Sequence, residues 1–135
     1  MTRRILALAL AASLATVACG GTDTAIEPKL ETVTASAFAG IVDTAQADLV
    51  ILDVRTPDEF VAGHIPGAVN VDYYEPSFRN DLDALDKDVP YALYCRSGNR
   101  SGDTLATMRD LGFTNVSELG GGIITWLEAG YPIEG

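Results

Sequence analysis

Short apolar runs alternate with helical patterns from residue 49 to residue 129, and this order restricts the chain to few architectures. The clearest run, 49–54, reads LVILDV and is rich in β-branched residues, which is typical of a strand buried on both faces. We expect further strands at 68–71, 91–95 and 116–119, a threonine-rich strand before Ser36, and helices at 36–45, 57–62, 75–85, 99–111 and 122–129. This alternation predicts an α/β fold with a mainly parallel central sheet flanked by helices.

Local signals support two of these helices. Thr56 is a suitable N-cap for the helix at 57–62, and Pro57 fits its first helical position. In the helix at 99–111, Leu105, Met108 and Leu111 mark one apolar face, and the glycine that follows is expected to end the helix.

The first 18 residues have the pattern of an export signal. Two arginines precede the apolar run at 5–18, ILALALAASLATVA, which is short for a spanning helix of about 20 residues. A basic start, a brief apolar middle and small residues before a cut site predict a signal peptide that is removed. We therefore assign 1–18 to a signal peptide, 19–31 to a lipidated N-terminus and flexible polar tether, and 32–135 to one folded domain.

The segment at 15–21, ATVACGG, resembles a bacterial lipobox, although Thr16 stands where that pattern usually has Leu. Cys19 would then become the acylated N-terminus, and several acyl chains hold a protein on a membrane. Ordinary signal cleavage, which leaves Cys19 unmodified, is the alternative. We expect an exported protein of the cell envelope, anchored by lipid to the periplasmic or extracytoplasmic face of a bacterial membrane.

The charge of the chain argues against two classes of partner. The formal net charge is −10, and removal of the signal takes away Arg3 and Arg4, which leaves seven basic and 19 acidic residues and a net charge of −12. Such a surface disfavours nucleic acid and electrostatic adhesion to anionic lipid, and we attribute the acidity mostly to solubility. No His, Cys and carboxylate cluster has metal-ligand spacing, so we expect neither metal nor other cofactor.

The segment 94–101, YCRSGNRS, carries the strongest sign of chemistry. It places Cys95 after an apolar run, at the carboxyl end of an expected strand, where active sites of α/β folds gather. Converging amides at the start of the next helix, a glycine at position 98 and the charges of Arg96 and Arg100 favour the thiolate and would hold a bound anion. The alternative is a small buried hydrophobe that closes a strand, but such a thiol would gain nothing from two arginines.

Three ordered segments resemble the rhodanese-like domains, over residues 32–135. LDVRTPDEF at 52–60 with GHIPGA at 63–68 is similar to the first signature of that family, and 94–101 is similar to its active loop. LGGGIITW at 119–126 with GYP at 130–132 is similar to its closing segment. The resemblance implies a three-layer sandwich and a sulfurtransferase in which a cysteine takes a sulfane sulfur from a donor such as thiosulfate and passes it to a nucleophilic acceptor.

Carried over by position, the resemblance makes Cys95 the catalytic sulfur carrier. Asp53 and Arg55 would line or support the site, and Arg100 would either contact the donor or, as we favour, pair with Asp53 or Glu59. The partners implied are a small anionic sulfur donor and a thiophilic acceptor, and the protein is expected to act as a monomer. The loop residues expected to bind the substrate are Arg96, Ser97, Gly98, Asn99, Arg100 and Ser101.

Two conspicuous side chains are expected to be structural. His64 is the only histidine, and we expect its imidazole to fix loop backbone by hydrogen bonds, because a preformed thiolate needs no general base. Trp126 is expected in the core.

Two other functions remain as alternatives. A phosphatase or arsenate reductase of the same fold would have a loop one residue longer, commonly with His before the cysteine, whereas Tyr94 precedes Cys95 here. A non-catalytic rhodanese-like binding module would have lost the cysteine that this chain retains.

Overall fold

The computed structural model describes residues 20–21, 25–44 and 46–135. The expected signal peptide and Cys19 lie outside the described residues. In chain order the elements are β1 (Lys29–Val33), α1 (Ala35–Asp43), β2 (Val50–Asp53), α2 (Pro57–Ala62), β3 (Val69–Asn70), α3 (Phe78–Asp83), β4 (Tyr91–Tyr94), α4 (Asn99–Asp110), β5 (Asn115–Leu119) and α5 (Gly122–Glu128).

The strands form one sheet in the order β1-β5-β4-β2-β3, and every pairing is parallel. Leu93 of the central strand β4 lies opposite Leu52 of β2 on one side and Glu118 of β5 on the other. Because the strands are parallel, their carboxyl ends share one edge of the sheet, and α2, α4 and α5 all begin at that edge.

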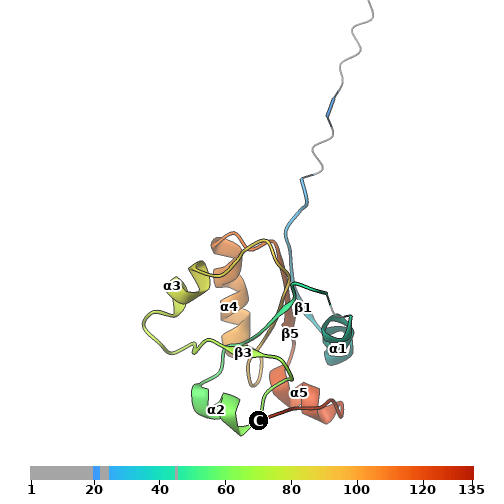
Figure 1. Ribbon diagram of the computed structural model, residues 1–135, viewed down its shortest axis with the longest axis vertical. Coiled ribbons are helices and arrows are strands. Elements are labelled where there is room, and N and C mark those ends of the chain that lie inside the picture. The colour runs from blue at the N-terminus through green and yellow to red at the C-terminus, as the bar shows by residue number, and fades with distance from the viewer. Residues whose placement is uncertain (1–19, 22–24, 45) are drawn as a thin grey trace, which may run out of the picture.

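Helices cover both faces of the sheet, which confirms the predicted α/β sandwich. Figure 1 shows α3 and α4 on one side and α1 on the other. Leu93 and Cys95 pack in the core cluster that contains Leu105 and Met108 of α4, whereas Tyr94 packs with Phe38 of α1 on the opposite face. Successive side chains of β4 therefore alternate between two cores, as a strand buried on both faces requires.

The local signals explain where the helices begin. Thr56 caps α2 in a capping box, in which its hydroxyl accepts from the Glu59 amide while the Glu59 carboxylate accepts from the Thr56 amide. The helix expected at 75–85 is shorter, 78–83, and turns precede it. Pro76 explains why the helix does not begin at Glu75, because the residue before a proline disfavours the helical region.

The boundary of the expected tether also needs correction. β1 begins at Lys29 and pairs with β5 along its whole length, from Lys29 opposite Asn115 to Val33 opposite Leu119. The last three residues of the segment predicted as tether, 29–31, therefore belong to the sheet. No helix in the described part of the chain is long and apolar enough to span a membrane.

Candidate active site

The predicted loop connects the central strand to the longest helix. Cys95 follows β4 directly, and α4 begins four residues later at Asn99. Gly98 stands at the N-cap with a φ of 96°, a left-handed conformation that strains any residue with a Cβ. The first amides of a helix have no acceptor within it, so this turn presents donors beside the cysteine.

The Cys95 thiol is enclosed by this turn. The residue is 1% exposed, and no disulfide involves it within the described part of the chain. The Gly98 amide donates to Sγ at 3.1 Å, and the Ser101 Oγ lies 3.3 Å from Sγ. The structure thus brings two of the predicted loop residues into contact with the sulfur, while Arg96, Ser97 and Asn99 are exposed.

The first turn of α5 forms hydrogen bonds with the loop backbone at Cys95 and Arg96. The amide of Ile123 donates to the Cys95 carbonyl at 2.9 Å, and the amide of Ile124 donates to the Arg96 carbonyl at 3.3 Å. Gly122 makes this approach possible, since a Cβ there would lie 2.3 Å from the Arg96 carbonyl oxygen and its φ is +63°. Gly122 therefore allows α5 to pack against the backbone of the loop that follows β4.

Arg100 pairs with Glu59 of α2, one of the two carboxylates proposed for it from the sequence. The contact is bidentate, at 2.8 and 2.9 Å, and neither side chain is more than 28% exposed. The hydrogen bond from Arg100 lowers the pKa of Glu59 to about 2. The guanidinium thereby links the start of α4 to α2 across the site.

Asp53 and Arg55 form a second, more deeply buried pair. Their closest contact is 2.6 Å, and Asp53 and Arg55 are 0% and 5% exposed. Arg55 also donates to the Gly63 carbonyl at 2.7 Å and lies over the ring of Tyr94, 5.6 Å from its centroid. Asp53 is therefore occupied by Arg55 rather than by Arg100, and the pair ties β2 to the turn after α2.

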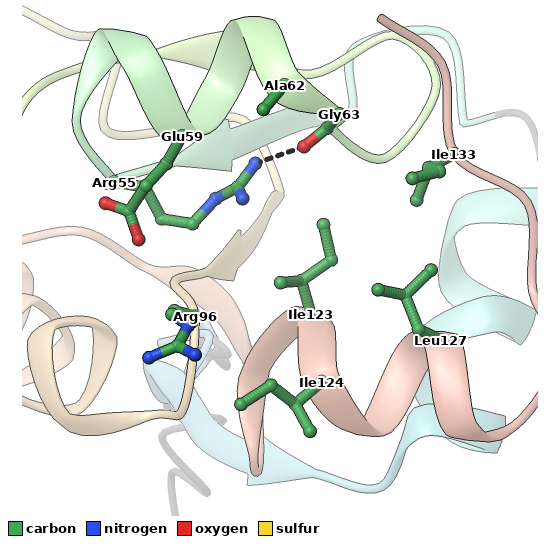
Figure 2. Close-up of a pocket in the computed structure, with 9 residues that line it drawn as sticks. All are labelled: Arg55, Glu59, Ala62, Gly63, Arg96, Ile123, Ile124, Leu127 and Ile133. Carbon is green, nitrogen blue, oxygen red and sulfur yellow. Dashed lines mark hydrogen bonds between the residues drawn. The ribbon is translucent and has the colours of Figure 1, made fainter.

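A pocket of about 370 Å³ opens beside the loop (Figure 2). Arg96, Glu59 and Arg55 supply its charged groups, and Figure 2 shows Arg96 opposite Glu59 and Arg55. The rest of the lining is apolar or backbone and comes from Ala62, Gly63, Ile123, Ile124, Leu127 and Ile133. An anion with a small apolar part fits this combination better than a fully hydrated ion does.

His64 and Trp126 have structural contacts, as expected. The His64 Nδ1 lies 2.9 Å from the Phe60 carbonyl, and its ring stacks on Phe60 at 3.8 Å between centroids. Trp126 is 3% exposed, packs edge-on against Phe38, and donates from Nε1 to the Pro132 carbonyl. In the described residues no three metal-ligating side chains gather at one point.

Glu118 is the residue of this site that sequence reasoning missed. It lies on β5, is 2% exposed, and accepts a hydrogen bond from Ser101 Oγ at 2.5 Å. A signal was available, because an acidic residue inside a strand of a sheet flanked by helices is rare without a partner. The apolar wall that α5 contributes to the pocket was also missed, since exposed isoleucine and leucine carry no signal by themselves.

The comparisons with known proteins agree on the family and the fold. The family model for the rhodanese-like domain matches residues 34–129. A sulfurtransferase from Allochromatium vinosum is 37% identical over 86 residues, which cover 64% of this chain and 78% of the relative. The thiosulfate sulfurtransferase GlpE of Pseudomonas entomophila is 35% identical over 85 residues, 63% of this chain and 75% of the relative.

A solved structure of a rhodanese-related protein from Thermoplasma volcanium superposes with a TM-score of 0.67 at 29% identity, over 77% of this chain and 97% of the other. Some curated relatives are longer. The chain spans 56% of two plant proteins that it matches, and 28% of matched proteins that join adenylyltransferase and sulfurtransferase in their names.

Substitution of Gly122 tests the seating of the loop on α5. We expect Gly122→Ala to destabilise the protein by about 2–4 kcal/mol, because the added methyl group meets the Arg96 carbonyl and the backbone is left-handed. Gly102→Ala in α4 is the matched control, since nothing lies within 4 Å of its Cβ position, and it should be neutral or stabilising by up to about 1 kcal/mol. Urea unfolding of both variants measures the difference, and equal effects would contradict this account.

Acidification tests the pair of Glu59 and Arg100. The pKa of Glu59 in the folded protein is about 2, below its ordinary value of 4.5, so its contribution to stability is present above the ordinary value and is lost as the pH falls toward 2. Between about pH 6 and pH 3, we expect the wild type to lose on the order of 1–2 kcal/mol more unfolding free energy than Glu59→Gln. Glu128→Gln, at an exposed site on α5, should lose as much unfolding free energy over this pH range as the wild type does. Parallel curves for wild type and Glu59→Gln would refute the assignment.

Proposed function

Since the chain belongs to the rhodanese-like family, we propose that it is a sulfurtransferase that carries a sulfane sulfur as a persulfide on Cys95. The proposal rests on the environment of that sulfur. Sγ accepts a hydrogen bond from the Gly98 amide and lies beside the Ser101 hydroxyl at the start of α4. Such a setting stabilises negative charge on sulfur, which is the form that attacks a sulfane donor.

In the first half of the reaction, the Cys95 thiolate attacks the outer sulfur of a donor such as thiosulfate. A bond forms between Sγ and that sulfur, the sulfur–sulfur bond of the donor breaks, and sulfite leaves with its electron pair. Arg96, on the pocket wall beside the loop, is placed to bind the anionic donor and the departing sulfite. The amides from Arg96 to Ser101 form a cradle for the charge of the outer sulfur.

In the second half, a nucleophilic acceptor attacks the outer sulfur and the electron pair returns to Sγ. Cyanide, sulfite or a thiol has the required affinity for sulfur. The pocket favours a donor or acceptor that combines an anionic group with an apolar part, because Ile124 and Leu127 lie on the same wall as Arg96.

The pairing of Arg100 with Glu59 favours sulfur transfer over phosphate hydrolysis. A phosphatase loop uses its arginine to bind the oxygens of a tetrahedral anion, usually through two hydrogen bonds. Here both guanidinium contacts go to Glu59, at 2.8 and 2.9 Å. Only four residues separate Cys95 from Arg100, so the cradle suits one sulfur atom better than a phosphoryl group.

Removal of the thiol tests the proposal. We expect Cys95→Ser to lower thiocyanate formation from thiosulfate and cyanide by about 10³-fold or more, because serine cannot hold the transferred sulfur. Mass spectrometry of the wild type after incubation with thiosulfate should show one additional sulfur on the peptide that contains Cys95. Transfer by the wild type that is no faster than transfer by Cys95→Ser would support a binding module instead, and brisk release of phosphate from an aryl phosphate that depends on Cys95 would support a phosphatase.

We also propose that residues 1–18 direct export and that Cys19 is acylated, so that the domain works as a monomer on the extracytoplasmic face of a bacterial membrane. The pattern ATVACGG at 15–21 supports this proposal. An exported sulfur carrier would handle sulfur compounds outside the cytoplasm.

Expression in a bacterial host with a labelled fatty acid tests the anchor. We expect label on the wild-type protein in the membrane fraction, and neither label nor membrane retention for Cys19→Ser, because acylation needs that thiol. Cys95→Ser should retain the label. Label that persists in Cys19→Ser, or its absence from the wild type, would show that the proposed modification is wrong.

A further inference from the structure

Glu118 is a carboxyl group enclosed beside the reactive thiol, and the proposed sulfur transfer gives it no role. It lies on β5 opposite Leu93, and Cys95 follows two residues later on the same face of the neighbouring strand. Among the described residues, no Lys, Arg or His forms an ion pair with Glu118, and its recorded hydrogen bond comes from Ser101. A buried carboxylate without a cation is costly, so its single partner is important.

Ser101 connects the carboxyl group to the thiol. Its Oγ lies 2.5 Å from Glu118 Oε1 and 3.3 Å from Cys95 Sγ. Cys95, Ser101 and Glu118 are 1%, 0% and 2% exposed. The contact of 2.5 Å is in the range of hydrogen bonds between a hydroxyl and a charged oxygen. A continuous path for a proton therefore runs from the sulfur to the carboxyl group inside the protein.

Counting hydrogens along this path gives a definite result. A serine hydroxyl has one hydrogen, and it lies between two groups that can each accept. With a thiol and a carboxylate, Sγ donates to Oγ and Oγ donates to Oε1. With a thiolate and a carboxylic acid, both bonds reverse. If both end groups were ionised, one contact would have no hydrogen, so the path is satisfied when the two ends hold one proton between them.

We propose that Cys95 and Glu118 share one proton through Ser101, and that Glu118 holds it while the sulfur is charged. In this step the S–H bond breaks as the proton moves to Oγ, and the hydroxyl hydrogen of Ser101 moves to Oε1. The sulfur keeps the electron pair that it uses against the donor. When the acceptor later removes the outer sulfur and the pair returns to Sγ, the proton can pass back by the same path.

This arrangement deepens the proposed function, on which its role in the reaction rests. A thiolate with a buried carboxylate behind it would place two negative charges close together. Sharing a proton keeps that enclosed region at one negative charge in the thiol, thiolate and persulfide states. It also supplies an acceptor for the thiol proton where solvent has almost no access.

The other charged groups near the path from Cys95 to Glu118 pair elsewhere or have no contact with it. The hydrogen bonds to Glu59 and, to a smaller extent, the charge of Cys95 raise the pKa of Arg100, and both guanidinium contacts go to Glu59. No hydrogen bond or ion pair links the path to any of the other ionisable groups on the surrounding elements: Arg96 of the loop, Lys29 and Glu31 of β1, Asp43 of α1, Asp53 and Arg55 at β2, Tyr91 and Tyr94 of β4, Asp103, Arg109 and Asp110 of α4, and Glu128 of α5.

Titration of the thiol and the carboxyl group in the same samples tests the shared proton. At neutral pH, where exposed carboxyl groups are ionised, the wild type should show the infrared carbonyl stretch of a protonated carboxyl group together with the ultraviolet absorbance of a thiolate. Glu118→Gln should lack the carboxyl band. Its peptide-resolved alkylation of Cys95 by iodoacetamide should reach full rate at least about one pH unit lower. In the wild type the shared proton resides on the sulfur part of the time, and it leaves the pair only at higher pH because its loss places two negative charges together, whereas the variant has no such second site.

Glu128→Gln is the control, with a wild-type band and alkylation profile expected at an exposed position. A wild-type thiolate without the carboxyl band would overturn the inference, and this measurement needs no variant to fold. Coincident alkylation profiles for wild type and Glu118→Gln would overturn it as well. These readouts concern the thiol and the carboxyl group and do not depend on catalysis. A wild type that fails to transfer sulfur from thiosulfate to cyanide would therefore reject the proposed function without deciding the proton sharing.

Discussion

Two hydrogen bonds from the first turn of α5 to the backbone of Cys95 and Arg96 govern the geometry of the site. They require the helix to approach the loop closely, and Gly122 is the residue that permits it. With its carbonyls held on one side, the loop turns its amides and its sulfur toward the other, where α4 begins. The position of the thiol therefore depends on hydrogen bonds between the backbone of α5 and the backbone of the loop, which satisfy two loop carbonyls.

Around this contact, an acidic chain uses its carboxylates to position its cations. Glu59 pairs with Arg100 and Asp53 pairs with Arg55, so both guanidinium groups connect elements that meet at the edge of the sheet. Arg96 is exposed on the pocket wall and pairs with no carboxylate in the described part of the chain. Arg55 and Arg100 thus connect parts of the fold, whereas Arg96 is the arginine that we propose binds the donor.

Much of this arrangement could be predicted from the sequence, because strand runs, caps and the loop are local signals. The helix at 57–62 was predicted at its observed bounds, since Thr56 and Pro57 specify its start. The partner of Arg100 could not be chosen between Asp53 and Glu59, because one ends a strand and the other lies in the helix that follows it, and only the structure shows Arg55 occupying Asp53. Glu118 was missed for a related reason: its meaning comes from β5 lying beside β4, and strand order is not a local property.

The sheet order also explains why a carboxyl group and a thiol can cooperate at this edge. Glu118 and Leu93 are level on neighbouring parallel strands, and β4 continues for one more residue before Cys95. Ser101, in the first turn of α4, then contacts both side chains because the helix packs over the face that they share. The residue after β4, a residue of α4 and a residue of β5 thus meet where almost none of their surface is exposed, and a hydrogen bond to a charged group is stronger there than at the surface. Because solvent has so little access to this thiol, the proton sharing that we propose gives the thiol proton an acceptor inside the protein.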